Sequence, residues 1–245
     1  MYLPAYTRLL LDMHKQRPIS GDYLSTGKQT VPWTYQQAKE FLSAEGIATR
    51  ELAADAIHYD LRTVERIAGG IDDVTFFALF CDARVRSMDA SSYEGADIIH
   101  NLCDPVPPEL HDSADFIFEG SCLDDCFNPA QLMLNVDRML RVGGRLFMVN
   151  LGTVTNIPGP AYAVCSVDWY TEFLEVNGYT EICVQVWSYV HVADQTWHPG
   201  PMMSGTPAMP SLPCCITVSA SKVARVLPQL QPMRKGYRDM HERAA

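Results

Sequence analysis

The feature that most constrains the fold is a regular alternation of short apolar segments with longer amphipathic ones. Short apolar runs bounded by turn residues are typical of strands, whereas apolar residues that recur every three or four positions are typical of helices. Strands are expected at residues 21–26, 84–88, 96–100, 114–119 and 145–150, and helices at residues 4–16, 34–44, 74–80, 130–140 and 167–177. This alternation predicts an α/β fold with a doubly wound, mostly parallel sheet.

Three further segments complete the expected domain. Residues 181–189 and 214–219 are extended and are expected to pair as an antiparallel C-terminal end of the sheet. Between them, residues 189–213 carry Trp197 and five prolines. So long a connection is usually functional or disordered, and we expect this one to cover a substrate pocket. Residues 49–70 have mixed helical spacing and are expected to form an inserted helical element. The sequence thus predicts a single domain over residues 1–245.

The charge balance restricts the classes of partner. With 19 basic and 29 acidic residues the net charge is −10, which offers no general electrostatic footprint for nucleic acid or an anionic membrane. The N-terminal residues lack the layout of a signal peptide, and no apolar stretch approaches the length of a membrane span, so a cytoplasmic location is expected. The eight cysteines lie mostly in apolar stretches, as reduced thiols do. A small-molecule substrate is the expected partner, and a homo-oligomer is left open.

Four loops follow the expected parallel strands. In a doubly wound sheet, ligands bind outside the carboxyl ends of the strands. The loops contain Gly27, which allows a close backbone approach; Asp89, an acid suited to ribose hydroxyls; Asn101, whose amide suits an adenine edge; and Glu119 in the middle of the expected cleft. Each also has a plainer interpretation: Gly27 as a tight turn, Asp89 as a cap of the next turn, and Asn101 as part of a turn.

Three segments of the chain, taken in combination, resemble a branch of the class I S-adenosylmethionine-dependent methyltransferases. They are the acid Asp89 followed by the run YEGADIIH at residues 93–100, then residues 114–127, then a helix ending in GGR at residues 143–145. The resemblance covers residues 20–179 and implies a Rossmann-like methyltransferase fold with S-adenosylmethionine as cofactor. The implied cofactor-binding residues are Thr26, Gly27, Lys28, Gln29, Asp89, Ala90, Asn101, Leu102, Glu119 and Gly120.

Catalytic candidates are fewer, because methyl transfer needs mainly alignment and at times a base. Asp124 and Asp125 could deprotonate a hydroxyl or hold an amine, although paired acids at a helix start more often complement the helix dipole. His191 and His198, in the proline-rich segment, are further candidate bases. No metal site is expected, because Cys122 and Cys126 lack a second Cys/His pair at zinc-binding spacing.

The function expected from the sequence is methylation of an oxygen or nitrogen of a small molecule. One departure from the family pattern leaves two alternatives open: the usual loop with three glycines after the first strand is replaced by Gly27-Lys28-Gln29. A catalytically silent, methyltransferase-like binding or scaffold subunit is one alternative. An enzyme that uses S-adenosylmethionine for a reaction other than methylation is the other.

Overall fold

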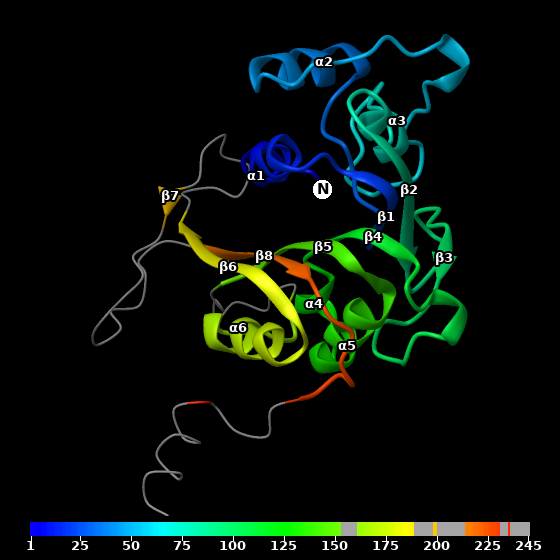
Figure 1. Ribbon diagram of the computed structural model, residues 1–245. Helices are drawn as coiled ribbons and strands as arrows, with labels where there is room; N and C mark the ends of the chain where they lie inside the picture. Colours follow the sequence, from blue (N-terminus) through cyan, green and yellow to red (C-terminus); the bar gives the residue numbers. More distant parts are fainter. Residues whose placement is uncertain (153–160, 189–197, 200–213, 231–234, 236–245) are drawn as a thin grey trace, which may run out of the picture.

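Strands and helices alternate along the chain in the computed structural model, which describes residues 1–152, 161–188, 198–199, 214–230 and 235 (Figure 1). The helices are α1 (Pro4–Gln16), α2 (Tyr35–Ala44), α3 (Asp73–Ala78), α4 (Cys122–Asp125), α5 (Pro129–Met139) and α6 (Val167–Val176), with 3-10 turns η1 (Ala54–Ala56) and η2 (Pro108–Leu110). The strands are β1 (Ser20–Thr26), β2 (Asp82–Asp89), β3 (Ile98–Ile99), β4 (Ala114–Gly120), β5 (Leu140–Leu151), β6 (Tyr179–Ser188), β7 (His198–Pro199) and β8 (Cys214–Lys222).

The strands form one sheet in the order β3-β2-β1-β4-β5-β8-β6-β7. Strands β1 to β5 pair in parallel, whereas β8 is antiparallel to both β5 and β6. The strand order changes direction between β1 and β4, because the chain moves outward from β1 to β3 and then returns to the other side of β1. This arrangement confirms the predicted fold class, a doubly wound and mostly parallel sheet with an antiparallel C-terminal end.

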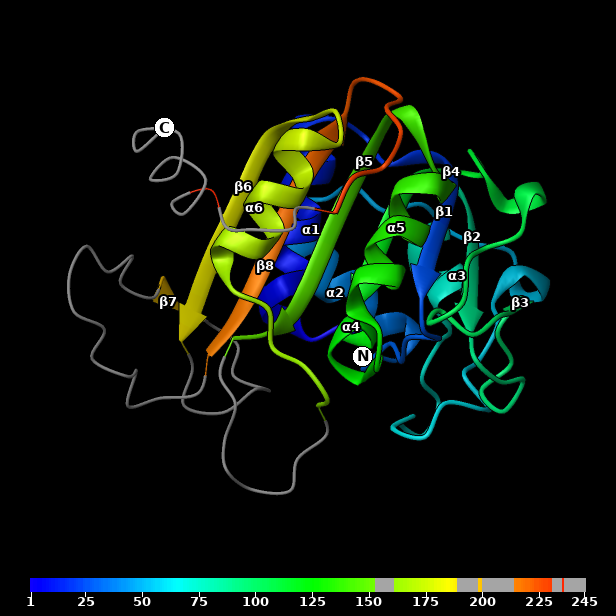
Figure 2. The ribbon, with the colours of Figure 1, turned by 90° about the horizontal axis from the view of Figure 1, so that it is seen from below.

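Helices cover both faces of the sheet, with α1, α2 and α3 on one face and α4, α5 and α6 on the other (Figures 1 and 2). The alternation of side chains along each strand divides the core accordingly. On β4, Phe116 and Phe118 pack in the cluster that contains Tyr2 and Leu10 of the N-terminal segment, and Ile117 packs in the cluster that contains the residues of α5 and α6. The two apolar layers fix which polar residues of β4 and β5 lie on each face.

Local signals in the sequence account for several helix starts. Thr34 forms a capping box with Gln37, Asp72 accepts a hydrogen bond from the Thr75 amide, and Pro129 occupies the first turn of α5. Asp72 is therefore the N-cap of α3. Among the described residues, no helix is both long and apolar enough to cross a membrane.

The clearest differences from the expected elements concern the segment 49–70 and the end of α5. The helical element expected at residues 49–70 is wrong in extent, because its only described helix is the three-residue turn η1. The helix expected to run to residue 140 ends at Met139, and β5 begins at once with Leu140. Gly143, which has a positive φ, lies inside this strand and does not separate the helix from the strand. The segment 189–213 lies outside the described residues except for His198 and Pro199, which form β7.

Candidate functional site

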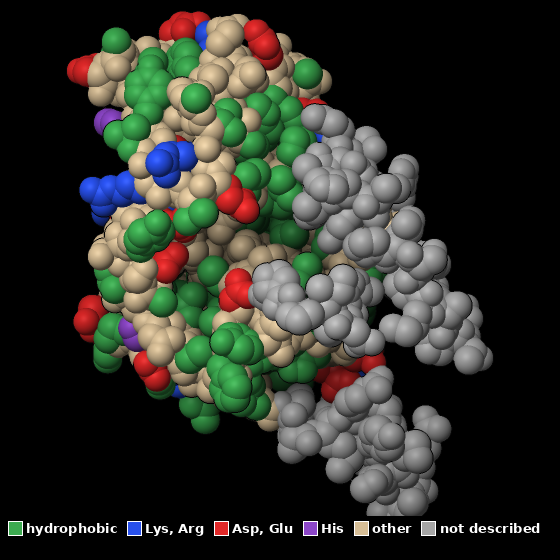
Figure 3. All heavy atoms as spheres, turned by 180° about the vertical axis from the view of Figure 1, so that it is seen from behind, with side chains coloured by type: hydrophobic (Ala, Val, Ile, Leu, Met, Phe, Trp, Pro, Cys, Tyr) green, Lys and Arg blue, Asp and Glu red, His purple; other side chains and the backbone are tan. Residues whose placement is uncertain are grey.

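The carboxyl ends of β1, β2, β4 and β5 meet at one end of the sheet (Figure 2). Thr26 at the end of β1 is in register with Met88 on one side and Glu119 on the other, so the loops after these three strands are neighbours. Figure 3 looks onto this face, which is hollowed near its middle, with acidic side chains beside the hollow. Three of the four predicted loops therefore start from adjacent strands at the point where the strand order changes direction.

Gly27 makes the turn after β1 in a conformation that favours glycine, with φ +75°. Its amide donates to the Met88 carbonyl at 2.6 Å. A Cβ atom built at this position would lie 2.7 Å from Cys122 Sγ and 3.3 Å from Gln29 Nε2. The requirement for glycine is thus explained by the turn and by the approach of Cys122, a side chain of the protein itself.

The side chains of Lys28 and Gln29 are engaged within the protein. Lys28 Nζ pairs with Asp73 Oδ1 at 2.5 Å, at the start of α3. Gln29 is buried, its Oε1 accepts from the Met1 amine at 2.6 Å, and its Nε2 donates to the Gly120 carbonyl at 3.4 Å. These contacts hold the loop after β1 between the N-terminus, α3 and the end of β4.

Asp89 at the end of β2 is half-buried, and both carboxylate oxygens accept from backbone amides. Oδ1 accepts from Ser91 at 3.2 Å and Oδ2 from Lys28 at 3.4 Å. The first contact is the turn that the plainer interpretation of Asp89 predicts, and the second joins the ends of β1 and β2. Both bonds are long, and an ionised carboxylate has about four acceptor sites, so Asp89 retains capacity for further donors.

The segment expected to face adenine divides in two. Asn101 is exposed, and its Oδ1 accepts from the Cys103 amide while its Nδ2 donates to Asp104 Oδ2, each at 3.0 Å. Leu102 is buried in the core beside α5, and its carbonyl accepts from Asn135 Nδ2 at 3.0 Å. The Asn101 side chain therefore shapes the turn, and the Leu102 side chain contributes to packing.

Glu119 is a fully buried carboxyl at the end of β4. Oε1 accepts from the Leu123 amide at 2.9 Å, which satisfies the start of α4, and Oε2 accepts from Asn150 Nδ2 at 2.7 Å. Burial raises the pKa of Glu119 to about 8, and Asp124 adds to the rise, while the Leu123 and Asn150 hydrogen bonds oppose it. The group is therefore mostly protonated at neutral pH.

The two catalytic candidates of α4 have different surroundings. Asp124 is buried, and its Oδ2 accepts from the Leu151 amide at 2.8 Å, whereas Asp125 is exposed. Burial raises the pKa of Asp124 to about 7, against the effect of the Leu151 hydrogen bond. A carboxyl with this pKa changes its charge near neutral pH, as a general base does.

The two candidate histidines do not join this group in the described part of the chain. His191 lies outside the described residues. His198 lies in β7, and its backbone pairs with that of Ser188 in β6. Strand β7 is at the edge of the sheet, separated from β1 by β4, β5, β8 and β6. Among the described residues, no group of His, Cys, Asp and Glu side chains could hold a metal ion.

Three residues of the site were not predicted from the sequence. Cys122 fills the space beside Gly27, and Asn150 binds Glu119. Burial raises the pKa of Tyr170 of α6, and Glu119 and Asp124 add to the rise. Asn150 carried a usable signal, since it is a polar residue at the end of an apolar strand. Tyr170 carried none, because an aromatic residue on the apolar face of a helix looks like any core residue.

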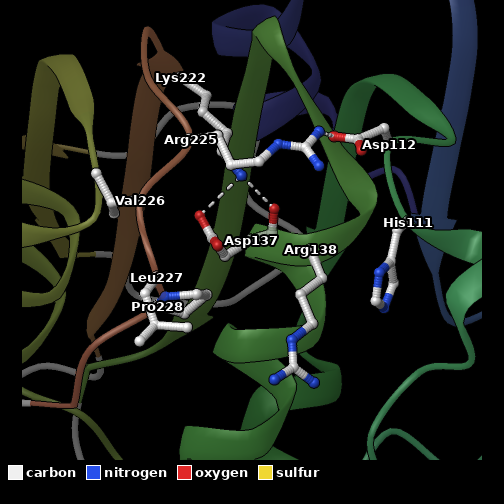
Figure 4. A pocket seen from close by; sticks show the side chains of 9 residues that line it. All are labelled: His111, Asp112, Asp137, Arg138, Lys222, Arg225, Val226, Leu227 and Pro228. Atoms are coloured by element: carbon white, nitrogen blue, oxygen red, sulfur yellow. Dashed lines mark hydrogen bonds and ion pairs between the residues drawn. The ribbon is translucent and has the colours of Figure 1, made fainter.

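Two cavities formed by described residues lie at the opposite end of the sheet. One, of about 380 Å³, is lined by the residues in Figure 4, where Lys222 points to Asp137 and Arg225 to Asp112. The other, of about 510 Å³, lies beside Arg145 and Arg17. Neither contains a residue predicted from the sequence to bind cofactor or substrate.

Comparisons with known proteins give matches to solved structures. No protein-family model matches the chain, and no curated protein matches it. The citrinin polyketide synthase CMeT domain is 14% identical, with 88% of this chain and 52% of that chain covered and a TM-score of 0.45. Phosphoethanolamine N-methyltransferase 2 of Haemonchus contortus, solved with S-adenosyl-L-methionine, is 11% identical, with 89% and 53% covered and a TM-score of 0.48. This chain thus spans about half the length of these two chains.

A putative methyltransferase of Bacillus halodurans C-125 matches at closer to its full length. It is 10% identical, with 88% of this chain and 99% of that chain covered and a TM-score of 0.46.

Proposed function

We propose that this protein binds S-adenosylmethionine where β1, β2 and β4 end and transfers its methyl group to an oxygen or nitrogen of a small molecule. The observation that carries the proposal is the meeting of Gly27, Asp89 and Glu119 at neighbouring strand ends, where the strand order changes direction. This is the place where doubly wound sheets bind nucleotide-like ligands. The resemblance of residues 88–102, 114–127 and 140–146 to class I methyltransferases supports the same cofactor.

The residues at this edge fit such a cofactor unequally. Asp89 suits the ribose, because it is half-buried and its two long hydrogen bonds leave acceptor capacity. Glu119 and Gly120 are proposed to line the methionine side, and the backbone near Asn101 the adenine. The loop after β1 fits less closely, since Cys122 and Gln29 already occupy the space beside Gly27.

S-adenosylmethionine, when bound, supplies an electrophilic methyl group on a positively charged sulfur. The protein then has to align the acceptor and, for a hydroxyl or an ammonium, remove a proton. Asp124 is the proposed base, because its pKa is about 7 and one of its oxygens, Oδ1, has no hydrogen-bond partner. The Leu151 amide orients the carboxylate through Oδ2.

Calorimetric titration with S-adenosylmethionine and S-adenosylhomocysteine tests the proposal. We expect saturable binding of both, and mass spectrometry of the purified protein is expected to detect one of them as a bound ligand. The absence of binding of either at millimolar concentration would exclude the enzyme.

A second candidate, a silent methyltransferase-like binding subunit, is favoured by one observation. Lys28 and Gln29, which replace the further glycines of the family, are tied to Asp73 and Met1. A subunit of this kind would show no saturable cofactor binding, yet would fold normally and retain its protein partner. The same titration therefore separates the two candidates.

A further inference from the structure

A group of four buried polar side chains lies on the α4–α6 face of the sheet, where β4 and β5 end. Side chains alternate between the two faces along β4 and β5, and residues such as Phe118 and Val149 face α1–α3. Their neighbours Glu119 and Asn150 therefore face α4–α6. The exposed fractions are 0% for Glu119, 1% for Asp124, 1% for Asn150 and 0% for Tyr170. We call these four residues the buried polar cluster.

Three of the six side-chain oxygen atoms of the cluster have a hydrogen-bond partner. Glu119 accepts from the Leu123 amide and from Asn150 Nδ2, and Asp124 Oδ2 accepts from the Leu151 amide. Three other atoms are buried without a partner, namely Asp124 Oδ1, Asn150 Oδ1 and the Tyr170 hydroxyl. Buried polar atoms in native proteins nearly always have partners, so three orphans in one cluster indicate a missing group.

The chemistry of the three atoms indicates what could satisfy them. Carboxylate and amide oxygens accept, and the Tyr170 hydroxyl, which lies beside the Asn150 side chain, can accept as well as donate, so a single group with several donors would satisfy all three atoms. No Lys or Arg side chain among the described residues pairs with these atoms, and the nearby Asp124 raises the cost of ionising Glu119. A positively charged donor would relieve both the missing hydrogen bonds and the unfavourable burial of the carboxylates.

An aromatic pair lies next to the cluster. Phe127 and Tyr162 are 84% and 76% exposed, and their rings meet edge to face with centroids 6.0 Å apart. The Tyr162 amide donates to the Asp124 carbonyl at 2.7 Å, which fixes the pair beside Asp124. Exposed aromatic rings next to a buried acid suit a ligand with an apolar body and a cationic end.

We propose that the buried polar cluster binds a primary ammonium group, whose three N–H donors match Asp124 Oδ1, Asn150 Oδ1 and the Tyr170 hydroxyl. Under the proposed function, two ligands carry such a group: an amine acceptor with an apolar body, and S-adenosylmethionine at its methionine end. Which of the two supplies the ammonium therefore rests on the proposed function, whereas the binding of an ammonium group does not rest on it.

For an amine acceptor the chemistry balances through Asp124. The ammonium gives one proton to Asp124 Oδ1 and becomes a neutral amine with a free electron pair. That pair forms the nitrogen–carbon bond as the carbon–sulfur bond breaks, and the bonding electrons remain on sulfur. The products are a methylated ammonium and the neutral thioether S-adenosylhomocysteine.

Calorimetry in two arms separates the sources. The first arm compares S-adenosylhomocysteine with 5′-methylthioadenosine, which lacks the amino acid. The second compares 2-phenylethylammonium with 2-phenylethanol, each with and without saturating S-adenosylhomocysteine. Both arms use the wild type, Asp124→Asn, Tyr170→Phe and the control Asp12→Asn, which removes a carboxylate from the exposed face of α1. Circular dichroism checks that each variant is folded, and Tyr170→Phe removes only a hydroxyl.

The expected result is a loss of at least about tenfold in affinity for one amine-bearing ligand in Asp124→Asn, a smaller loss in Tyr170→Phe, and none in Asp12→Asn. A loss for S-adenosylhomocysteine but not for methylthioadenosine identifies the cofactor as the source. A loss for 2-phenylethylammonium, with 2-phenylethanol bound weakly throughout, identifies an amine acceptor.

Two results would overturn the proposal: amine-bearing ligands that bind no better than their amine-free matches, or affinities in folded Asp124→Asn within about threefold of the wild type. If neither adenosine compound binds the wild type, the proposed function fails instead. The second arm then decides the ammonium site alone.

Discussion

Lys28 Nζ lies 2.5 Å from Asp73 Oδ1, with the two side chains 13% and 0% exposed, so this ion pair ties the loop after β1 to the start of α3. Removal of one partner of a buried pair leaves the other charge uncompensated. We expect Asp73→Asn to lower the free energy of unfolding by about 3–5 kcal/mol, measured by urea denaturation. The double variant Lys28→Met, Asp73→Leu is expected to recover most of the loss, and no recovery would mean that the pair is not what stabilises this loop.

Gly27 and Gly46 provide a matched test of the turn after β1. Both have positive φ, +75° and +73°, but a Cβ atom at Gly46 would meet nothing within 4 Å, whereas one at Gly27 would lie 2.7 Å from Cys122 Sγ. Gly46→Ala is expected to cost about 1–2 kcal/mol of unfolding free energy from backbone strain alone, and Gly27→Ala clearly more. Thermal or urea denaturation of Gly27→Ala with and without Cys122→Ala isolates the contact, and equal costs at the two glycines would contradict it.

Glu119 predicts a specific pH dependence of stability. Its pKa rises from 4.5 in the unfolded chain to about 8 in the folded protein. Between these values the folded state holds a proton that the unfolded state has lost, so this group destabilises the fold progressively as the pH rises, with the full penalty above the folded pKa. Glu119→Gln should therefore gain stability relative to the wild type between about pH 5 and about pH 8.5, measured by urea denaturation.

A constant difference between the two proteins would show that Glu119 ionises normally, and the opposite trend would show that folding lowers its pKa; either result would contradict the prediction. Asp124, whose pKa is raised to about 7, is also expected to destabilise the fold as the pH rises. The unfolding free energy of the Glu119→Gln variant should therefore still fall with rising pH, but less than that of the wild type.

The sequence predicts the layers of this fold better than the details of its site. Alternating apolar residues such as Phe116 and Phe118 specify a buried strand because period-two burial is a local property. The end of α5 is less predictable, since Gly143 marks a turn inside β5 as well as it would mark a helix end.

The engagement of the site residues depends on contacts between distant parts of the chain. The sequence places Lys28 in a loop at the carboxyl edge, but its partner Asp73 is 45 residues away, and no local pattern pairs them. Asn150 joins Glu119 because β5 pairs with β4, and Tyr170 joins them because α6 packs against β6 and β8. Residue types at strand ends could therefore be predicted, and their mutual contacts could not.

Asp89 and Asp82, at the two ends of β2, allow the most direct test of the central claim that a ribose-bearing cofactor binds at the carboxyl edge. The measurement is the affinity of S-adenosylhomocysteine for the wild type, Asp89→Ala and Asp82→Ala by calorimetry. Hydrogen bonds to a charged group are worth about 1.5–3 kcal/mol, so Asp89→Ala should weaken binding by that amount while Asp82→Ala leaves it unchanged. An unchanged affinity in a folded Asp89→Ala protein would contradict the account, because Asp89 would then serve only the turn to Ser91.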